Sequence, residues 1–272
     1  MAVVLDGKEV ARKIRQNLKE EVSKLKGEGI SPKLAVIMVG DDSASKIYVK
    51  NKSIACNEIG IEYEEYLLNE ETTMDELLNL IDKLNNDKTI NGILLQSPIP
   101  KNLDINEAFK AIDPIKDVDG FNPMNVGKLC LGQDAFISCT PYGVIKILED
   151  YNIEIEGKNA VIIGRSNIVG KPMLQCLLNK NATVTVCHSR TKNLGEITKQ
   201  ADILVAAIGK PKFVTADMVK EGAVVIDVGI NRNEDGKLVG DVDYQNVESK
   251  AAYITPVPGG VGPMTIAMLM EN

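Results

Sequence analysis

The residues that could carry chemistry in this chain are lysine, tyrosine, aspartate and glutamine. The sequence holds one histidine, His188, and five cysteines without any Cys-x-x-Cys spacing. This pattern argues against a zinc site and against disulfides, and it is typical of a protein from a reducing cytoplasm. A Ser-His-Asp mechanism would depend on His188 alone. We therefore expect no metal, with proton transfer carried by Lys, Tyr, Asp, Gln and backbone groups.

The first candidate is a stripe of residues on one face of a helix predicted over 43–59. The helix would begin at an N-cap, Ser43 or Ser45, and stop at Gly60. A lysine beside a tyrosine and apolar groups is partly desolvated, which lowers its pKa and frees it for proton transfer. The alternative is a surface lysine that lies along a packed tyrosine, and spacing leaves it open. The stripe consists of Tyr48, Lys52, Cys56 and Ile59.

Three further segments place polar or glycine-rich sequence after apolar runs. Gln96 ends a predicted strand at 90–96, where ligand contacts are common, although it could also cap a turn. The sequence Lys-Asp-Val-Asp-Gly at 116–120 sets two acids, the second being Asp119, beside a glycine turn, and either acid could serve that turn instead. The segment 256–263 holds three prolines and three glycines and predicts a stiff loop before a helix.

A candidate phosphate site follows the strand expected at 159–164, where a glycine loop leads into a helix. Free backbone N–H groups and the helix N-terminus favour an anion there. An ATP-binding P-loop is excluded, because five residues separate Gly164 from Gly170 and Pro172 stands where Mg²⁺ ligation needs Ser or Thr. The G-x-G-x-x-G pattern is also absent, so the loop does not by itself identify a dinucleotide site.

The end of the next strand, 182–187, bears on which nucleotide would bind. An NAD site places Asp or Glu there, about 20 residues after the glycine loop, for the ribose 2′-OH. This strand runs instead into His188, Ser189 and Arg190, with no acid. Ser189 with the cations Arg165 and Arg190 suits a 2′-phosphate, so we expect NADP; the alternative is that both arginines are solvated loop charges. We interpret His188 as a loop residue and not as a base.

Short apolar runs alternate with helix-length amphipathic stretches, which predicts βαβ units, a mainly parallel sheet and the α/β class. A length of 272 residues favours two domains. We expect one domain over 1–139 plus 256–272 and a second over 140–255, with the last helix packing back on the first half. Strands are expected at 34–39, 61–68, 90–96, 159–164, 182–187, 202–209, 223–229 and 252–255, and helices at 6–28, 43–59, 72–85, 104–112, 141–151, 169–180 and 262–270.

The amino-acid composition and net charge argue against a membrane or a nucleic acid as partner. The chain is 44% hydrophobic and 25% charged, as in ordinary globular proteins, and it has no apolar run of membrane-spanning length and no signal-peptide layout at its start. A net charge of −7 argues against general nucleic-acid binding. A local basic pocket for an acidic small molecule remains compatible with these numbers.

Five motifs, in this order, resemble the bifunctional methylenetetrahydrofolate dehydrogenase/methenyltetrahydrofolate cyclohydrolase family of folate one-carbon metabolism. They are YVKNKSIAC, GILLQSPIPK, KDVDGFNPMNVGKL, GRSNIVGKPM and TPVPGGVGPMT, and the resemblance covers essentially the whole chain. It implies an N-terminal catalytic, folate-binding domain and a Rossmann-like NADP-binding domain, with the active-site cleft between them. It also implies a cytoplasmic homodimer that serves purine biosynthesis and binds neither nucleic acid nor membrane.

The resemblance further implies a role for each matching residue. Lys52 is the general acid/base of cyclohydrolysis, Tyr48 stacks on the folate, and Gln96 hydrogen-bonds the lysine. Asp119 binds the pterin edge and completes the catalytic set. Further substrate contacts are the backbone of Pro258, Gly259 and Gly262. NADP contacts are Gly164, Arg165, Ser166, Ser189 and Ile230, of which Ile230 lies in a glycine turn after a predicted strand.

Two departures and three alternatives remain at this point. Ser97 stands where the family generally carries a leucine that touches folate, and the chain ends at Asn272, several residues before the family's last helix commonly ends. The alternatives are a dehydrogenase without the second activity, another NADP-dependent reductase such as a shikimate-dehydrogenase-like protein, and a non-catalytic NADP- or folate-binding regulator. Lys52 with Gln96 separates the regulator from the enzymes, because a pure binder needs no lysine there.

Overall fold

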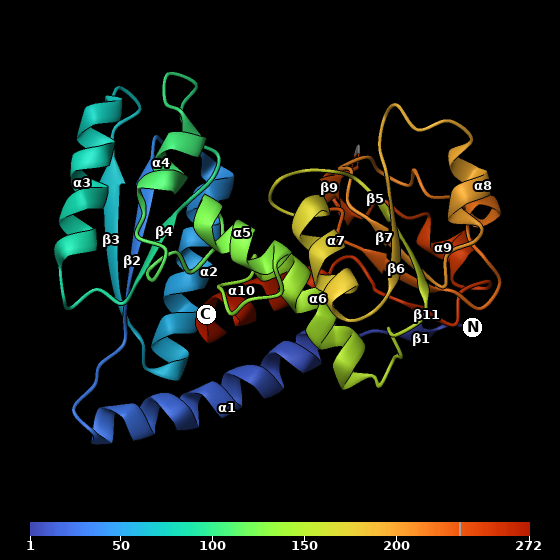
Figure 1. Cartoon of the computed structure of the whole chain (residues 1–272), viewed down its shortest axis with the longest axis horizontal. Helices are drawn as coiled ribbons and strands as arrows, with labels where there is room; N and C mark the ends of the chain where they lie inside the picture. Colours follow the sequence, from blue (N-terminus) through green and yellow to red (C-terminus); the bar gives the residue numbers. More distant parts are fainter. Residues whose placement is uncertain (234) are drawn as a thin grey trace. The chain divides into compact units, whose positions relative to one another are not determined.

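A computed structural model of the chain describes residues 1–233 and 235–272 and divides into two compact units. The large unit comprises Met1–Arg12 and Ser138–Met268, and the small unit comprises Lys13–Ile137 and Leu269–Asn272. The division falls inside two helices, α1 (Gly7–Gly27) and α10 (Val261–Glu271), which Figure 1 shows near the two ends of the chain.

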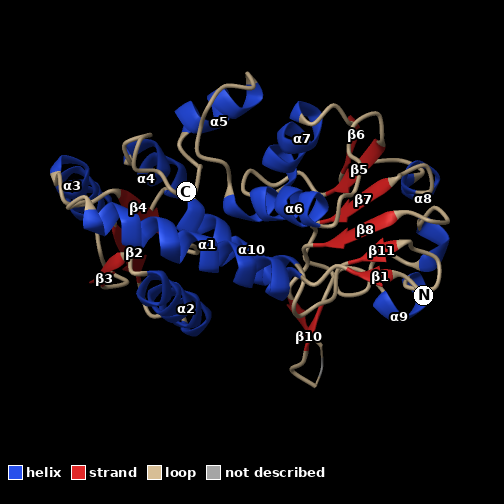
Figure 2. Ribbon diagram, turned by 90° about the horizontal axis from the view of Figure 1, so that it is seen from below, coloured by secondary structure: helices blue, strands red, loops and turns tan. Residues whose placement is uncertain are grey.

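The small unit is built on a three-stranded parallel sheet of order β3-β2-β4. One face of β2 carries Ala35, Ile37 and Val39, which pack with the helices α3 and α4, while α2 lies on the other face (Figure 2). Alternation of side chains along the strand therefore gives each face its own helical cover. The elements are β2 (Lys33–Val39), α2 (Ser43–Ile59), β3 (Glu62–Leu68), α3 (Met74–Asn86), β4 (Gly92–Leu95), α4 (Ile105–Ala111) and α5 (Pro123–Cys130).

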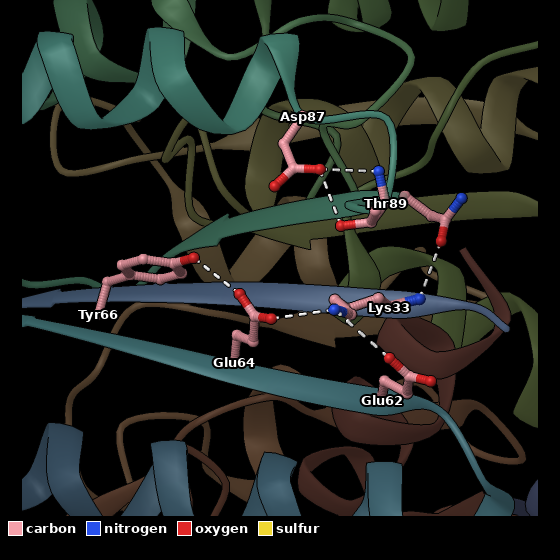
Figure 3. A network of polar contacts seen from close by, with 7 residues as sticks. Lys33, Glu62, Glu64, Tyr66, Asp87 and Thr89 are labelled. Carbon is pink, nitrogen blue, oxygen red and sulfur yellow. Dashed lines mark hydrogen bonds and ion pairs between the residues drawn. The ribbon is translucent and has the colours of Figure 1, made fainter.

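A polar network covers the α3 side of the edge strand β3 (Figure 3). The ammonium group of Lys33 lies 3.4 Å from a carboxylate oxygen of Glu62 and 3.0 Å from one of Glu64. The hydroxyl of Tyr66 donates to the other oxygen of Glu64 at 2.7 Å. These contacts tie β3 to its neighbour β2, and within the described residues β3 has a strand partner on that side only.

Two buried side chains fix the segment after α4. Asp117 is 1% exposed and its carboxylate accepts from the backbone N–H groups of Phe121 and Asn122 and from the amide of Asn125. Burial raises the pKa of Asp117 to about 6. The neighbouring ammonium group of Lys116 caps the end of α3, where it donates to the carbonyl oxygens of Leu84, Asn85 and Asp87. Asp117 and Lys116 thus both have a structural role: each satisfies backbone hydrogen-bonding groups of neighbouring segments.

The large unit contains a six-stranded parallel sheet of order β1-β11-β8-β7-β5-β6 (Figure 2). The strand order reverses between β5 and β7, and such reversals open a ligand crevice at the carboxyl ends of the strands. The strands are β1 (Val3–Val4), β5 (Asn159–Ile163), β6 (Thr183–Cys187), β7 (Ile203–Ala206), β8 (Val224–Asp227) and β11 (Tyr253–Ile254), beside a short antiparallel pair, β9 (Asn231–Arg232) and β10 (Leu238–Val239). The helices are α6 (Cys139–Asp150), α7 (Gly170–Asn179), α8 (Leu194–Thr198), α9 (Tyr244–Val247) and the 3-10 turn η1 (Ala216–Met218).

The packing units differ from the expected domains, 1–139 plus 256–272 and 140–255, in two segments. The first residues join the large unit because β1 pairs with β11. Residues 256–268 also join it: a Cβ on Gly7 would lie 1.8 Å from the carbonyl oxygen of Gly260, so the two backbones are in direct contact. Only Leu269–Asn272 return to the small unit, where the Asn272 amide donates to the Val118 and Ile137 carbonyl oxygens.

Candidate active site

The helix α2 that carries the lysine begins at Ser43, as predicted, but its N-cap precedes both expected caps. Asp42 is the N-cap and its carboxylate accepts from the backbone N–H of Ser45 at 2.7 Å, so the prediction of Ser43 or Ser45 was wrong. A carboxylate here satisfies an amide of the first turn and also faces the positive end of the helix dipole. The helix ends at Gly60 with φ 91°, as predicted.

The stripe on α2 becomes more buried along the helix. Tyr48 is 43% exposed, Lys52 is half-buried, and Cys56 is fully buried. Burial raises the pKa of the Cys56 thiol to about 12, and the thiol donates to the sulfur of Met270. A protonated, buried thiol is a poor nucleophile. Cys56 is therefore not a candidate nucleophile, and Lys52 stays the candidate reactive group of the stripe.

Lys52 is held by the glutamine that the sequence singled out. Its ammonium nitrogen donates to Oε1 of Gln96 at 2.8 Å, and Gln96 is 7% exposed directly after β4. The amide nitrogen of Gln96 donates to the Ser97 carbonyl oxygen at 2.6 Å, which turns the amide oxygen toward the lysine. This bond favours a positioned lysine over the alternative of a surface lysine that only lies along a tyrosine. The Ser97 contact uses backbone only, so the serine in place of leucine leaves Gln96 in position.

Asp119 lies on the neighbouring segment of the same unit. Asp117 forms an isolated parallel bridge with Ile93 in β4, and Asp119 lies in the turn that follows, which the Gly120 N–H closes on the Asp117 carbonyl oxygen at 3.0 Å. Asp119 is half-buried, and the turn is held by Asp117, which accepts from the amides of Phe121 and Asn122. The alternative of a turn-forming acid applies to Asp117.

The glycine loop of the large unit is closed tightly at both ends. Gly164 has φ 126°, and a Cβ on it would lie 2.2 Å from the carbonyl oxygen of Ala207, which follows β7. A Cβ on Gly170 would lie 2.3 Å from the Gly164 carbonyl oxygen. Both positions therefore require glycine. The loop lies at the carboxyl ends of β5 and β7, where the strand order reverses.

The amides at the start of α7 are bonded, which differs from the expectation of free N–H groups. The hydroxyl oxygen of Ser166 accepts from the backbone N–H of Val169 at 3.2 Å and of Gly170 at 3.3 Å. An oxygen that accepts twice still has its own proton to donate. Ser166 can therefore present an O–H to a phosphate, beside the exposed side chain of Arg165.

The turn after β6 presents Ser189 and Arg190, which are both exposed. The imidazole Nδ1 of His188 accepts from the backbone N–H of Arg190 at 3.1 Å, and the His188 N–H donates to the hydroxyl of Thr191 at 2.8 Å. His188 thus shapes the turn, in agreement with its interpretation as a loop residue. The exposed hydroxyl, the cations at 165 and 190 and the glycine cradle together fit a phosphorylated dinucleotide.

The remaining predicted contacts also belong to the large unit. Ile230 is 50% exposed and would lie 3.8 Å from a Cβ on Gly262. In the 256–263 loop, Pro258 is exposed and Gly259 has φ 111°. Tyr48, Lys52, Gln96 and Asp119 all belong to the small unit. The expected cleft between the domains stays a prediction.

Among residues 1–233 and 235–272, no group of three His, Cys, Asp or Glu side chains could hold a metal ion. In the same part of the chain, every helix is too short or too polar to cross a membrane.

Comparisons with known proteins agree with the motifs. The model of the tetrahydrofolate dehydrogenase/cyclohydrolase catalytic domain matches residues 5–119, and that of the NAD(P)-binding domain matches residues 138–272. The bifunctional protein FolD of Campylobacter concisus (strain 13826) is 61% identical over 269 residues, which cover 99% of this chain and 95% of the relative.

Two solved structures are also similar. The bifunctional enzyme FolD, methylenetetrahydrofolate dehydrogenase/cyclohydrolase, from Campylobacter jejuni aligns with a TM-score of 0.99 at 54% identity, over 100% of this chain and 96% of that one. The methylenetetrahydrofolate dehydrogenase-cyclohydrolase of Trypanosoma brucei, in complex with NADP cofactor and an inhibitor, aligns with a TM-score of 0.94 at 38% identity, over 99% of this chain and 95% of that one.

Proposed function

We propose, since the chain belongs to the tetrahydrofolate dehydrogenase/cyclohydrolase family, that it catalyses two successive folate reactions. It oxidises 5,10-methylenetetrahydrofolate to 5,10-methenyltetrahydrofolate with NADP⁺, and it hydrolyses that product to 10-formyltetrahydrofolate. The observation that carries the proposal is the 2.8 Å hydrogen bond between Lys52 and the buried amide of Gln96. A binding protein without catalysis has no need of this pair.

The large unit binds the dinucleotide. The loop 164–170 cradles phosphate, Ser189 and Arg165 face the 2′-phosphate, and Ile230 packs against the cofactor. NADP⁺, when bound, supplies the hydride acceptor for the methylene carbon. Loss of hydride leaves a cation that the two flanking folate nitrogens stabilise. The main contribution of the protein to this step is therefore to position the folate and the cofactor.

The small unit carries the hydrolysis. Water adds to the methenyl carbon, and the neutral amine of Lys52 takes a proton from that water. The bond from this carbon to N5 then breaks: the resulting ammonium of Lys52 returns the proton to N5, and the remaining hydroxyl proton leaves to solvent as the formyl C=O forms on N10. Gln96 holds the lysine nitrogen in reach, Tyr48 stacks on the folate, and Asp119 binds the pterin edge. Pro258, Gly259 and Gly262 contribute backbone contacts to the substrate.

We expect Lys52→Met to lower the rate of methenyltetrahydrofolate hydrolysis by about 100-fold or more, the usual contribution of a positioned acid/base group. The Kd for NADP should change less than about twofold, because the cofactor residues belong to the other unit. Hydrolysis is followed by loss of the methenyl absorbance, and NADP binding by calorimetry.

The matched control is Lys50→Met, since Lys50 is exposed and two residues away on α2, on the opposite side of the helix. Lys50→Met should hydrolyse at the wild-type rate. Undiminished hydrolysis by Lys52→Met would contradict the role given to Lys52.

We expect Ser189→Asp to reverse the cofactor preference. A carboxylate at this turn repels a 2′-phosphate and accepts a hydrogen bond from a 2′-OH. The ratio of kcat/KM for NADP⁺ to that for NAD⁺ should fall by about tenfold or more, while the hydrolysis rate stays unchanged. Steady-state oxidation of methylenetetrahydrofolate with each cofactor measures it. An unchanged ratio would remove Ser189 from the cofactor site.

The enzyme is further proposed to act as a homodimer. The support is the outer edge of β3: no strand of the described residues 1–233 and 235–272 pairs there, which leaves backbone hydrogen-bonding groups for a strand of a second copy. The side chain of Leu67 on β3 is 64% exposed in the single chain. A second copy that paired with β3 would cover it.

Sedimentation equilibrium should therefore give twice the 29.6 kDa chain mass. We expect Leu67→Glu to shift the protein toward the monomer, because the substitution sets a charge in an apolar contact. Leu131→Glu is the control, since Leu131 is 73% exposed on the loop after α5. A dimer that both variants retain equally would place the interface elsewhere.

The proposed location is the cytoplasm. All five cysteines are free thiols, and four of them are buried. Free thiols of this kind are stable in a reducing compartment. The folate substrate and NADP are the partners that the proposed function requires.

A further inference from the structure

Two buried carboxylates that the sequence analysis did not single out lie at the carboxyl edge of the large unit's sheet. The first, Asp241, is 0% exposed. One of its oxygens accepts from Asn231 Nδ2 at 2.9 Å. Its other contacts come from the loop directly after β7, where it accepts from the backbone N–H groups of Ile208, Gly209 and Lys210 at 2.7, 3.0 and 2.8 Å. A buried carboxylate with four donors fixes each of them strongly.

The second carboxylate, Asp227, ends β8 and is 3% exposed. It accepts from the backbone N–H groups of Gly229, Asp241 and Val242, each at 2.9 Å. Its own N–H donates to the hydroxyl of Thr255 at 2.7 Å. Because Asp227 binds the backbone of Asp241, the two acids form one connected network, which we call the carboxylate clamp.

Two glycines allow the clamp to close. A Cβ on Gly229 would lie 2.3 Å from an oxygen of Asp241, and a Cβ on Gly240 would lie 1.8 Å from an oxygen of Asp227. Any other residue at either position would displace a carboxylate from its donors. In the sequence, the clamp corresponds only to an Asp close to a Gly in two separate segments, 227–229 and 240–241. Such short pairs have no helix or strand periodicity, so periodicity does not predict the clamp.

The clamp joins three loops of the large unit. It holds residues 208–210 after β7, residues 229–231 after β8, and Thr255 at the start of the 256–263 loop. These loops leave the carboxyl edge of one parallel sheet, where dinucleotides bind. Their conformations are therefore set together, by two side chains that have almost no access to solvent.

Ile230 is the residue most directly affected. Its neighbour Gly229 is held by Asp227, and its other neighbour Asn231 is held by Asp241. Ile230 itself is 50% exposed. An apolar side chain held half in solvent by buried charges on both sides gains no core packing from that arrangement, but it is preorganised to contact an apolar ligand surface.

We infer that the carboxylate clamp is a positioning device for cofactor binding, in which Asp241 acts through Asn231 to hold Ile230 against NADP. The inference rests on the proposed function. Asp227, Asp241 and Asn231 are positioning residues, because they act through the loops and do not touch the ligand.

The experiment removes the link that joins Asp241 to the Ile230 loop and keeps the rest of the clamp. Asn231→Ala deletes one hydrogen bond to a buried carboxylate, and the three backbone donors to Asp241 remain. Such a bond is worth roughly a factor of ten in an equilibrium constant. We expect the Kd for NADP to rise about tenfold and methenyltetrahydrofolate hydrolysis to stay within about twofold of wild type.

Two further variants show whether a change in the Kd for NADP comes from the lost hydrogen bond, from the smaller side chain or from general damage to the loop. Asn231→Asp has the same size but cannot donate and sets a second carboxylate beside Asp241, so its Kd should rise at least as much. Asn233→Ala is the matched control: the Asn233 side chain accepts from the Lys237 N–H within the same β9–β10 hairpin. Its Kd should equal that of wild type. Calorimetry gives the Kd values, and thermal unfolding confirms that each variant is folded.

The outcomes separate the inference from the proposed function. If wild type binds NADP and both Asn231→Ala and Asn233→Ala have the wild-type Kd, the inference is overturned and the function is left intact. Wild type that binds NADP but does not oxidise methylenetetrahydrofolate would overturn the function, while the Kd values would still decide the inference. A wild type that does not bind NADP would overturn both.

Discussion

The direction of the strands is the constraint on which this structure depends. All strands in both principal sheets are parallel, so their carboxyl ends meet at one edge and each connection must return across the sheet. In the small unit the order reverses around β2, and in the large unit around β5. Gln96 and the 164–170 loop both follow strands beside these reversals. The same rule of topology therefore places the lysine's partner in one unit and the phosphate cradle in the other.

At these edges the chain relies on neutral or backbone partners more than on exposed charge. Lys52 is held by an amide, and a neutral partner positions the nitrogen without adding the opposite charge that would favour the ammonium form. The large unit buries two acids, Asp227 and Asp241, whose oxygens accept from backbone N–H groups and from the amide of Asn231. A net charge of −7 is thus uninformative about the anionic ligands, because the groups that meet them are local.

Much of this could be predicted from the sequence, for reasons that particular residues illustrate. The stripe of Tyr48 and Lys52 follows from helical spacing. The predicted range of α2, 43–59, matches the observed one, and Gly60 is an unambiguous stop at its end. Asp42 was missed as the cap because several cap-forming residues stand together at 41–45. The helix α5 was missed although Asn122 before Pro123 is a start signal, since its eight residues are too few to show a period.

The rest depends on contacts between distant segments, which spacing cannot supply. The short strand β1 exists because it pairs with β11 at the far end of the sequence, and residues 256–268 join the large unit because Gly260 meets Gly7. The carboxylate clamp unites residues from 208 to 255. Pairs of turn-forming residues such as Asp227 and Gly229 are common in any sequence. Only the fold shows that Asp227 is buried together with the backbone groups of Asp241 and Val242 that it binds.

We propose that Lys52, held by a neutral amide, carries the proton in hydrolysis. The most direct test is the pH dependence of methenyltetrahydrofolate hydrolysis in wild type and in Gln96→Glu, which keeps the shape and adds a carboxylate beside the lysine. The carboxylate favours the ammonium form, and only the neutral amine can accept a proton from water. The acidic limb of the profile should therefore move to higher pH by about one unit or more. Profiles that coincide would contradict the account.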